Sequence, residues 1–202
     1  MKPILCLILL LPFAFNLEAQ AQWTYGEAKT RCDSIRDHNL ALKSFPSVRS
    51  DCVVGALIPD FTAQTMDGRE ITSGDLKGKV TIINFWFMFC APCVAELPGL
   101  NAIVATYGDR LNYLAINGSD DPPLVPDFLA NNPFDFTHIS DGGDLATEIF
   151  RMSWGYPTTF IVDQNGVIVK AFSGGKTDDR AIEEIQEKIV PVIDELLNSN
   201  QD

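Results

Sequence analysis

The chain has 202 residues, of which 46% are hydrophobic, so it is long enough for one domain with its own core and a short extension. Its 15 basic and 27 acidic side chains give a formal net charge of -12. This charge argues against a nucleic-acid-binding protein, because there is no basic stripe that could neutralise phosphates.

The first 21 residues have the pattern of an export signal. Lys2 supplies a positive charge, residues 4–15 are apolar but too few to span a bilayer comfortably, and residues 19–21 (Ala-Gln-Ala) match a small-x-small cleavage site. We therefore expect a signal peptide at 1–21 and a periplasmic or otherwise exported protein whose mature chain begins near Gln22. An uncleaved membrane anchor is the alternative.

Residues 22–52 form an N-terminal extension ahead of a predicted domain at 53–202, and residues 27–37 are helix-like. The extension contains Cys32 and Cys52, and an oxidising compartment permits disulfides. We expect a structural disulfide between these two cysteines, which would contribute about 3 kcal/mol in the chain-entropy model. A second redox-active pair is the alternative.

The first half of the predicted domain contains a hairpin, a buried strand, a helix and a second strand. Asp67-Gly68 is typical of a hairpin turn, and residues 80–87 are almost continuously apolar, as in a central strand. Residues 91–107 are helix-like with Pro98 inside, where a kink is expected. Residues 111–117 form the next buried strand.

The second half predicts a short helix at 126–130, a short strand at 136–139 and a helical stretch at 145–151. Strands at 158–162 and 167–172 are joined at Asn165-Gly166, the strongest short-range hairpin signal. A closing helix covers 178–197, and Pro191 should bend or shorten it. A strand-helix-strand crossover requires parallel strands, whereas a hairpin requires antiparallel strands. We therefore predict an α/β fold of three layers, α/β/α, with a mixed central sheet.

The sequence Cys90-Ala91-Pro92-Cys93 lies between the first buried strand and its helix. A helix N-terminus presents free N–H groups and positive potential, which promotes ionisation of a thiol. We expect Cys90 to be the exposed attacking thiolate and Cys93 the more buried resolving thiol, which releases the substrate from a mixed disulfide on Cys90. Such a pair near a βαβ unit is typical of thioredoxin-like redox chemistry.

Two other roles compete for this pair. A zinc site would need two further ligands, but there is no second C-x-x-C, and His38 and His138 are isolated in the sequence. A purely structural disulfide is disfavoured because tight C-x-x-C rings at helix starts are usually labile. We expect neither a metal nor a cofactor.

Three further motifs make the pattern specific: Asn84-Phe85-Trp86 before the cysteines, residues 155–160 (Gly-Tyr-Pro-Thr-Thr-Phe) about sixty residues later, and Pro-Asp-Phe at 59–61. With Glu96 after the second cysteine, they resemble the thioredoxin superfamily, in particular the exported TlpA/ResA-like thiol-disulfide oxidoreductases related to the redoxins. The resemblance covers residues 53–197 and leaves 22–52 unexplained.

The resemblance implies roles for further residues. Pro157 would be cis and would face the disulfide, and the backbone of Tyr156 would pair with an extended substrate. Glu96 would be the acid that accepts the Cys93 proton, with a pKa raised by shielding under Trp86 and Phe87; a surface glutamate is the alternative. The sequence departs from the pattern at Asn84, which replaces a buried acid, and at Phe89, which replaces a tryptophan at the rim of the substrate surface.

The sequence thus predicts an exported enzyme that reduces disulfides of cysteine-containing protein substrates and draws electrons from a membrane or periplasmic thiol donor. We expect a monomer. Residues 109–148 hold eight acidic residues and one basic one, which we interpret as a solvated face rather than a docking surface for a basic partner. The rival functions are a thiol peroxidase of the peroxiredoxin type, which usually has Thr where Phe87 stands, and a non-catalytic binding module.

Overall fold

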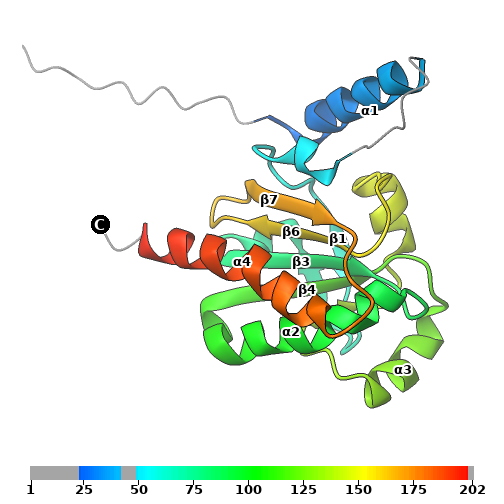
Figure 1. Ribbon diagram of the computed structural model, residues 1–202, viewed down its shortest axis with the longest axis vertical. Helices are drawn as coiled ribbons and strands as arrows, with labels where there is room; N and C mark the ends of the chain where they lie inside the picture. Colours follow the sequence, from blue (N-terminus) through cyan, green and yellow to red (C-terminus); the bar gives the residue numbers. More distant parts are fainter. Residues whose placement is uncertain (1–22, 42–48, 200–202) are drawn as a thin grey trace, which may run out of the picture.

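The structure, a computed structural model, describes residues 23–41 and 49–199. Its helices and strands form a five-stranded sheet covered by helices, with a separate two-stranded hairpin (Figure 1). In chain order the elements are α1 (Tyr25–Ala41), η1 (Ser50–Val53), β1 (Thr62–Gln64), β2 (Glu70–Thr72), η2 (Ser73–Leu76), β3 (Val80–Trp86), α2 (Ala91–Tyr107), η3 (Gly108–Arg110), β4 (Leu111–Asn117), η4 (Pro122–Leu124), α3 (Val125–Asn131), β5 (Thr137–Ile139), η5 (Leu145–Ile149), β6 (Thr158–Val162), β7 (Ile168–Ser173) and α4 (Arg180–Asn198).

The main sheet is mixed, as predicted, with the strand order β5-β4-β3-β6-β7. β3, β4 and β5 are parallel to one another, whereas β6 and β7 form an antiparallel hairpin against β3. The turn of this hairpin contains Gly166 at a φ of 89°, a conformation that glycine adopts without strain. The β1–β2 hairpin is likewise present, with Gly68 in its turn.

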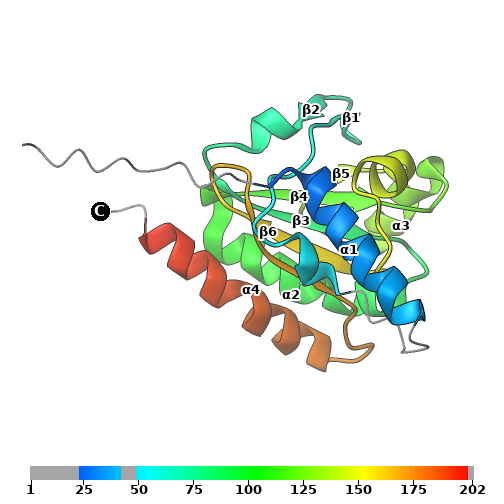
Figure 2. The same cartoon turned by 90° about the horizontal axis from the view of Figure 1, so that it is seen from above.

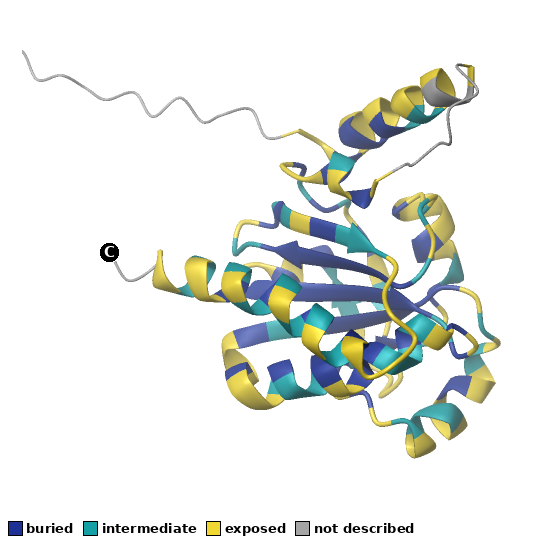
Figure 3. Ribbon diagram, in the orientation of Figure 1, coloured by how far each residue is buried: buried dark blue, intermediate teal, exposed yellow. Residues whose placement is uncertain are grey.

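β3 and β6, at the middle of the sheet, are buried at every residue, which explains why β3 is apolar almost throughout. Val80, Ile82 and Trp86 of β3 pack with α2 and α4, while Ile83 and Phe85 pack with α1 and the segment around η5. Successive side chains of a strand point to opposite faces, so one strand supplies both cores. Figure 2 shows α2 and α4 together along one face, and Figure 3 shows the buried sheet between exposed outer helix surfaces.

Two helices refine the prediction. The stretch predicted as helical at 145–151 is a π-helix at Leu145–Ile149. The closing helix is not shortened at Pro191 and continues to Asn198, because its apolar side chains Ile185, Ile189 and Ile193 are fully packed against the sheet face. None of the helices within the described residues is long and apolar enough to cross a membrane.

The N-terminal extension packs on the domain. Tyr25 of α1 donates its hydroxyl hydrogen to the carbonyl of Phe150 at 2.8 Å, and Tyr25 is buried in the core. The turn η1 lies beside β7, as Figure 1 shows. The signal peptide expected at 1–21 lies outside the described residues.

Candidate active site

Cys90 and Cys93 form a disulfide at the start of α2, and their Cα atoms are 5.1 Å apart. Cys90 is the N-cap residue: its Sγ accepts a hydrogen bond from the backbone N–H of Cys93 at 3.2 Å, and its carbonyl accepts one from Val94. Pro92 fits the first turn, where a backbone N–H has no helical partner. The chain therefore places both sulfurs at the positive end of a helix.

The two cysteines differ in exposure less than the sequence suggested. Cys93 is completely buried, and Cys90, expected to be exposed, is only 5% exposed in this disulfide-bonded form. The reason is that its sulfur is folded back onto the first turn of α2 and bonded to Cys93. The exposed side chain is its neighbour Phe89, at 85%.

The loop before Cys90 is held by an acid that the sequence analysis did not single out. Asp120, just after β4, accepts hydrogen bonds from the backbone N–H of Met88 and the side-chain amide of Asn117, both at 2.6 Å. In addition, Cys90 donates its own N–H to the carbonyl of Phe87. These bonds connect the cysteine loop to the end of β4.

The peptide bond between Tyr156 and Pro157 is cis, as the resemblance implied. Pro157 is buried, and the Tyr156 ring meets Phe87 edge to face, with centroids 5.4 Å apart. The Tyr156 ring also lies against Gly118, where a Cβ atom would be 2.1 Å from the tyrosine oxygen. Any larger residue at 118 would displace this tyrosine.

Gly175, in the loop between β7 and α4, lies where the cysteine loop, Pro157 and Glu96 come close to one another. A Cβ atom on Gly175 would lie 3.8 Å from both Pro92 and Pro157, and 3.7 Å from the carboxylate oxygen of Glu96. The cysteine loop, the cis-proline and the buried acid therefore meet at one backbone position. In the sequence, the paired glycines at 174 and 175 are the only sign of this position.

Glu96 is buried rather than on the surface, with 3% exposure. Its Oε1 accepts a hydrogen bond from the Asn84 amide at 2.8 Å, and the same amide donates to Thr159 at 3.0 Å. Burial raises the pKa of Glu96 from 4.5 to about 8, against the opposing effects of the Asn84 hydrogen bond and the charge of Lys188. Asn84, noted as a departure from the family pattern, is thus the partner of this acid.

Cys32 and Cys52 form the second disulfide, which joins α1 to η1. Cys32 belongs to the hydrophobic core on one face of the sheet, whereas Cys90 and Cys93 belong to the core on the other. A direct exchange between the two pairs would therefore require a large rearrangement.

The two histidines lie apart from the cysteines. His138 is buried, its Nε2 is 2.8 Å from the carbonyl of Phe134, and burial lowers its pKa. His38 is on the exposed side of α1. Within the described residues, no three His, Cys, Asp or Glu side chains are grouped so that they could hold a metal ion.

Comparisons with known proteins agree on one family. The Redoxin family model matches residues 53–189. The chain is 30% identical over 137 residues to the thiol-disulfide oxidoreductase ResA of Geobacillus thermodenitrificans, covering 67% of this chain and 78% of that protein. It is 32% identical over 126 residues to the thioredoxin-like protein YneN of Bacillus subtilis, covering 61% of this chain and 73% of that protein.

Solved structures show the same fold. A candidate DsbE thiol:disulfide interchange protein from Chlorobium tepidum superimposes with a TM-score of 0.59 at 25% identity. The match covers 68% of this chain and 95% of that one. The Redoxin family model begins after α1, the helix that carries Cys32.

Proposed function

This chain belongs to the Redoxin family, as a TlpA/ResA-like member of the thioredoxin superfamily, and from that premise we propose that it reduces protein disulfides outside the cytoplasm through Cys90 and Cys93. It is a thiol-disulfide oxidoreductase. The observation that carries the proposed site is the position of the Cys90–Cys93 disulfide at the N-cap of α2, next to the loop that also meets the cis-proline 157.

The reaction begins with the reduced pair. The Cys90 thiolate attacks a substrate disulfide, forms a mixed disulfide and expels one substrate thiolate, which takes a proton from water. The Cys93 thiolate then attacks the Cys90 sulfur and expels the second substrate thiolate. Two electrons pass to the substrate, and the enzyme is left with the disulfide seen in the structure. A thiol donor at the membrane or in the periplasm restores the reduced pair.

We assign to Glu96 the role of accepting the proton of the Cys93 thiol. It follows Cys93 by three residues, so the two share one face of α2, and both are buried. Burial raises the pKa of Glu96 to about 8, so its carboxylate is a stronger proton acceptor than an ordinary glutamate. The Asn84 amide holds the carboxyl in place.

Substrate binding is assigned to the surface around Cys90. The exposed ring of Phe89 offers an apolar contact beside the disulfide, and the backbone of Tyr156, next to the cis-proline, offers hydrogen bonds to an extended chain. A protein segment with a cysteine in an extended conformation fits these two features.

Insulin reduction tests the proposal. Wild-type protein with a thiol donor should reduce insulin, and Cys90→Ser should abolish this activity. Cys93→Ser should accumulate a mixed disulfide on Cys90, visible by mass under non-reducing conditions. Equal insulin reduction by wild type and Cys90→Ser would instead favour the non-catalytic binding module, and rapid peroxide consumption by Cys90 would favour the peroxidase.

The role of Glu96 has its own readout. In Glu96→Gln, resolution of the mixed disulfide should slow by about a hundredfold, the usual contribution of a positioned proton acceptor. The pH titration of the Cys93 thiol should also change. An unchanged Cys93 titration would remove Glu96 from the mechanism while leaving the cysteine chemistry intact.

Export is proposed from the first 21 residues and from the Cys32–Cys52 disulfide, which is typical of oxidising compartments. N-terminal sequencing of the protein recovered from the cell envelope should give a chain that begins near Gln22. Recovery of the chain with residue 1 or 2 at its N-terminus would support the membrane-anchor alternative.

A further inference from the structure

A groove of about 380 Å³ lies between the N-terminal extension and the last strand of the sheet. Residues 49–51 form one wall, residues 154–156 a second, and residues 171–174 the third. Its volume is in the range of ordinary ligand sites. Neither the family motifs nor the proposed mechanism assigns it a role.

The outer edge of β7 is unpaired where it lines this groove. The Gly174 N–H donates to the Pro157 carbonyl at 2.8 Å, so these two residues form a hydrogen-bonded antiparallel pair. Such pairs alternate with non-hydrogen-bonded ones along the ladder. The pairs Thr158–Ser173 and Phe160–Ala171 are therefore not hydrogen-bonded to each other. The backbone N–H and C=O groups of Ala171 and Ser173 consequently point away from β6.

Among the described residues, the turn η1 lies beside this edge, but backbone hydrogen bonds to it are made only at its beginning. Ile168 accepts a hydrogen bond from Gly55 and donates one to Ala56, both at 2.8 Å. Further along, the outward N–H and C=O groups of Ala171 and Ser173 have no backbone partner among the residues that the structure describes. In the described part of the chain these outward groups are therefore unpaired. Ala171 is 5% exposed and Ser173 is partly exposed, and both line the groove, so the part of β7 nearest the active site is an edge to which another strand can add.

The groove continues into the candidate active site. Tyr156 lines it and precedes the cis-proline. At its other side, Gly174 leads directly to Gly175, whose backbone lies against Pro92 and Pro157. A chain whose cysteine reaches Cys90 can therefore extend along β7 without a gap.

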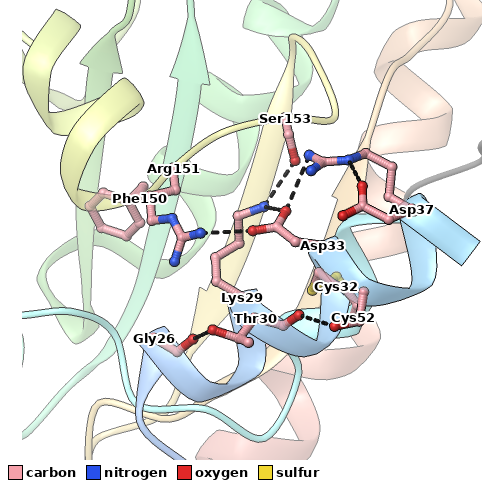
Figure 4. Close-up of polar contacts among 12 residues, drawn as sticks. Gly26, Lys29, Thr30, Cys32, Asp33, Asp37, Cys52, Phe150, Arg151 and Ser153 are labelled. Carbon is pink, nitrogen blue, oxygen red and sulfur yellow. Dashed lines mark hydrogen bonds and ion pairs between the residues drawn. A yellow bond between two sulfur atoms is a disulfide. The ribbon is translucent and has the colours of Figure 1, made fainter.

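The N-terminal extension holds two walls of the groove in place. Cys52, next to the wall at 49–51, is bonded to Cys32 of α1. Lys29 of α1 is 1% exposed; its Nζ donates to Ser153 at 2.9 Å and lies 4.5 Å from the centroid of the Trp154 ring. Figure 4 shows the lysine between α1 and the loop that carries Ser153, with the disulfide behind it.

We propose that this groove binds an extended segment of the substrate protein, flanking its reactive cysteine, which adds as a strand to the open edge of β7 at Ala171 and Ser173. The inference rests on the proposed function, because the occupant is the substrate of the Cys90–Cys93 pair. The extension at 23–53 then serves to build the outer wall of the substrate groove.

Ala171→Pro tests the inference, because the proline ring removes the outward N–H and occupies its place. The fold should tolerate this change, since edge strands accept proline where the N–H faces outward. The KM for insulin should rise about tenfold, as expected for one or two lost hydrogen bonds, with kcat unchanged. Reduction of oxidised glutathione, which is too short to reach β7, should stay at the wild-type rate. Ala171→Gly, which keeps the N–H, is the matched control.

An unchanged KM for insulin in Ala171→Pro would overturn the groove proposal. If wild type reduced neither insulin nor glutathione disulfide, the proposed function itself would fail instead.

Hydrogen exchange provides a test that does not rely on a proline variant. In Cys93→Ser, insulin B chain or glutathione can be trapped on Cys90 as a mixed disulfide. The amides of Ala171 and Ser173 should exchange at least tenfold more slowly with insulin B chain trapped than with glutathione trapped. Equal exchange in the two complexes would also overturn it.

Discussion

Glu96 makes the stability of this protein depend on pH. Its pKa in the folded protein is about 8, above the ordinary value of 4.5, because burial disfavours the carboxylate. Between these two values the unfolded chain has lost this proton and the folded chain keeps it, so the free energy of unfolding falls as pH rises. The stabilisation is complete below pH 4.5 and is lost by about pH 8.

We therefore predict that Glu96→Gln is less sensitive to pH than wild type. Urea unfolding at about pH 5 and about pH 8.5 should show a loss of several kcal/mol in wild type that is largely absent in the variant. His138, a buried group whose pKa is lowered from 6.5 by burial, is present in both proteins and cancels in the difference. Parallel pH profiles for the two proteins would contradict the raised pKa.

Asp33 is the shared acceptor for three cations. It lies 3.1 Å from Lys29, 3.2 Å from Arg36 and 2.7 Å from Arg151. Lys29 is buried, so removing its carboxylate would leave a buried charge unpaired. We predict that Asp33→Asn destabilises the protein by about 3 kcal/mol, more than Lys29→Met, which removes the buried charge itself.

Chemical denaturation of the two variants checks this order. Asp37→Asn is the matched control, because Asp37 is on the same helix, is 68% exposed at its side chain and, among the described residues, has its ion pair with the partly exposed Arg36. It should change the free energy of unfolding by less than about 0.5 kcal/mol. A larger loss in Lys29→Met than in Asp33→Asn would mean that the lysine stabilises through its packing on Trp154.

At the level of single residues, the sequence was informative wherever a motif encodes the chemistry. The pairing of Cys90 with Cys93 and the cis bond before Pro157 both followed from short patterns. Gly118 and Gly175 could not be identified in this way. At Gly118 the requirement for a missing side chain comes from Tyr156, and Gly175 is of interest because it lies beside Pro92 and Pro157. Only the fold brings these distant residues near.

At the level of elements, the Cys32–Cys52 disulfide joins α1 to η1 across a sequence separation of 20. A bridge of this span restricts the unfolded chain and should contribute about 3 kcal/mol in the chain-entropy model. We predict that the double variant Cys32→Ser, Cys52→Ser loses about this much stability. Because the bridge lies in the other core, the reduction potential of the Cys90–Cys93 pair should not change.

Denaturant unfolding and equilibration with glutathione measure these two quantities separately. A Cys90→Ser, Cys93→Ser variant is the complementary control, since it retains only the bridge in the extension. If the Cys32–Cys52 pair were reduced at the same potential as Cys90–Cys93 and exchanged electrons with it, the static role would be wrong and the second redox pair would be the better interpretation.

The predictability of elements followed the strength of their local pattern. The strands at 80–86, 111–117 and 158–162 were predicted to within one residue, because long apolar runs bounded by turns have few other conformations. The short turn η1 was missed, since four residues carry no periodicity. The π-helical form at 145–149 was not predicted either. It is followed directly by Phe150, whose ring contacts aromatic residues from three other segments, and the local sequence does not show these contacts.

At the level of the whole molecule, two opposing features decide whether copies of the chain associate. The open edge of β7 is a potential site for pairing between copies. The net charge of -12 opposes it, because approaching copies repel one another over a Debye length of about 10 Å at 0.1 M salt. Within the part of the chain that the structure describes, Ala171 and Ser173 are the residues of β7 whose outward backbone groups lack a backbone partner, so the attraction is small and we expect the repulsion to prevail.

We predict a monomer at about 0.1 M salt across micromolar concentrations, measured by sedimentation equilibrium. At about 1 M salt the Debye length falls to about 3 Å, and any weak edge pairing should then become visible as a concentration-dependent rise in mass. Ala171→Pro should remove that rise, while Ala171→Gly should keep it. A dimer at low salt, or one at high salt that Ala171→Pro leaves intact, would show that another surface joins the copies.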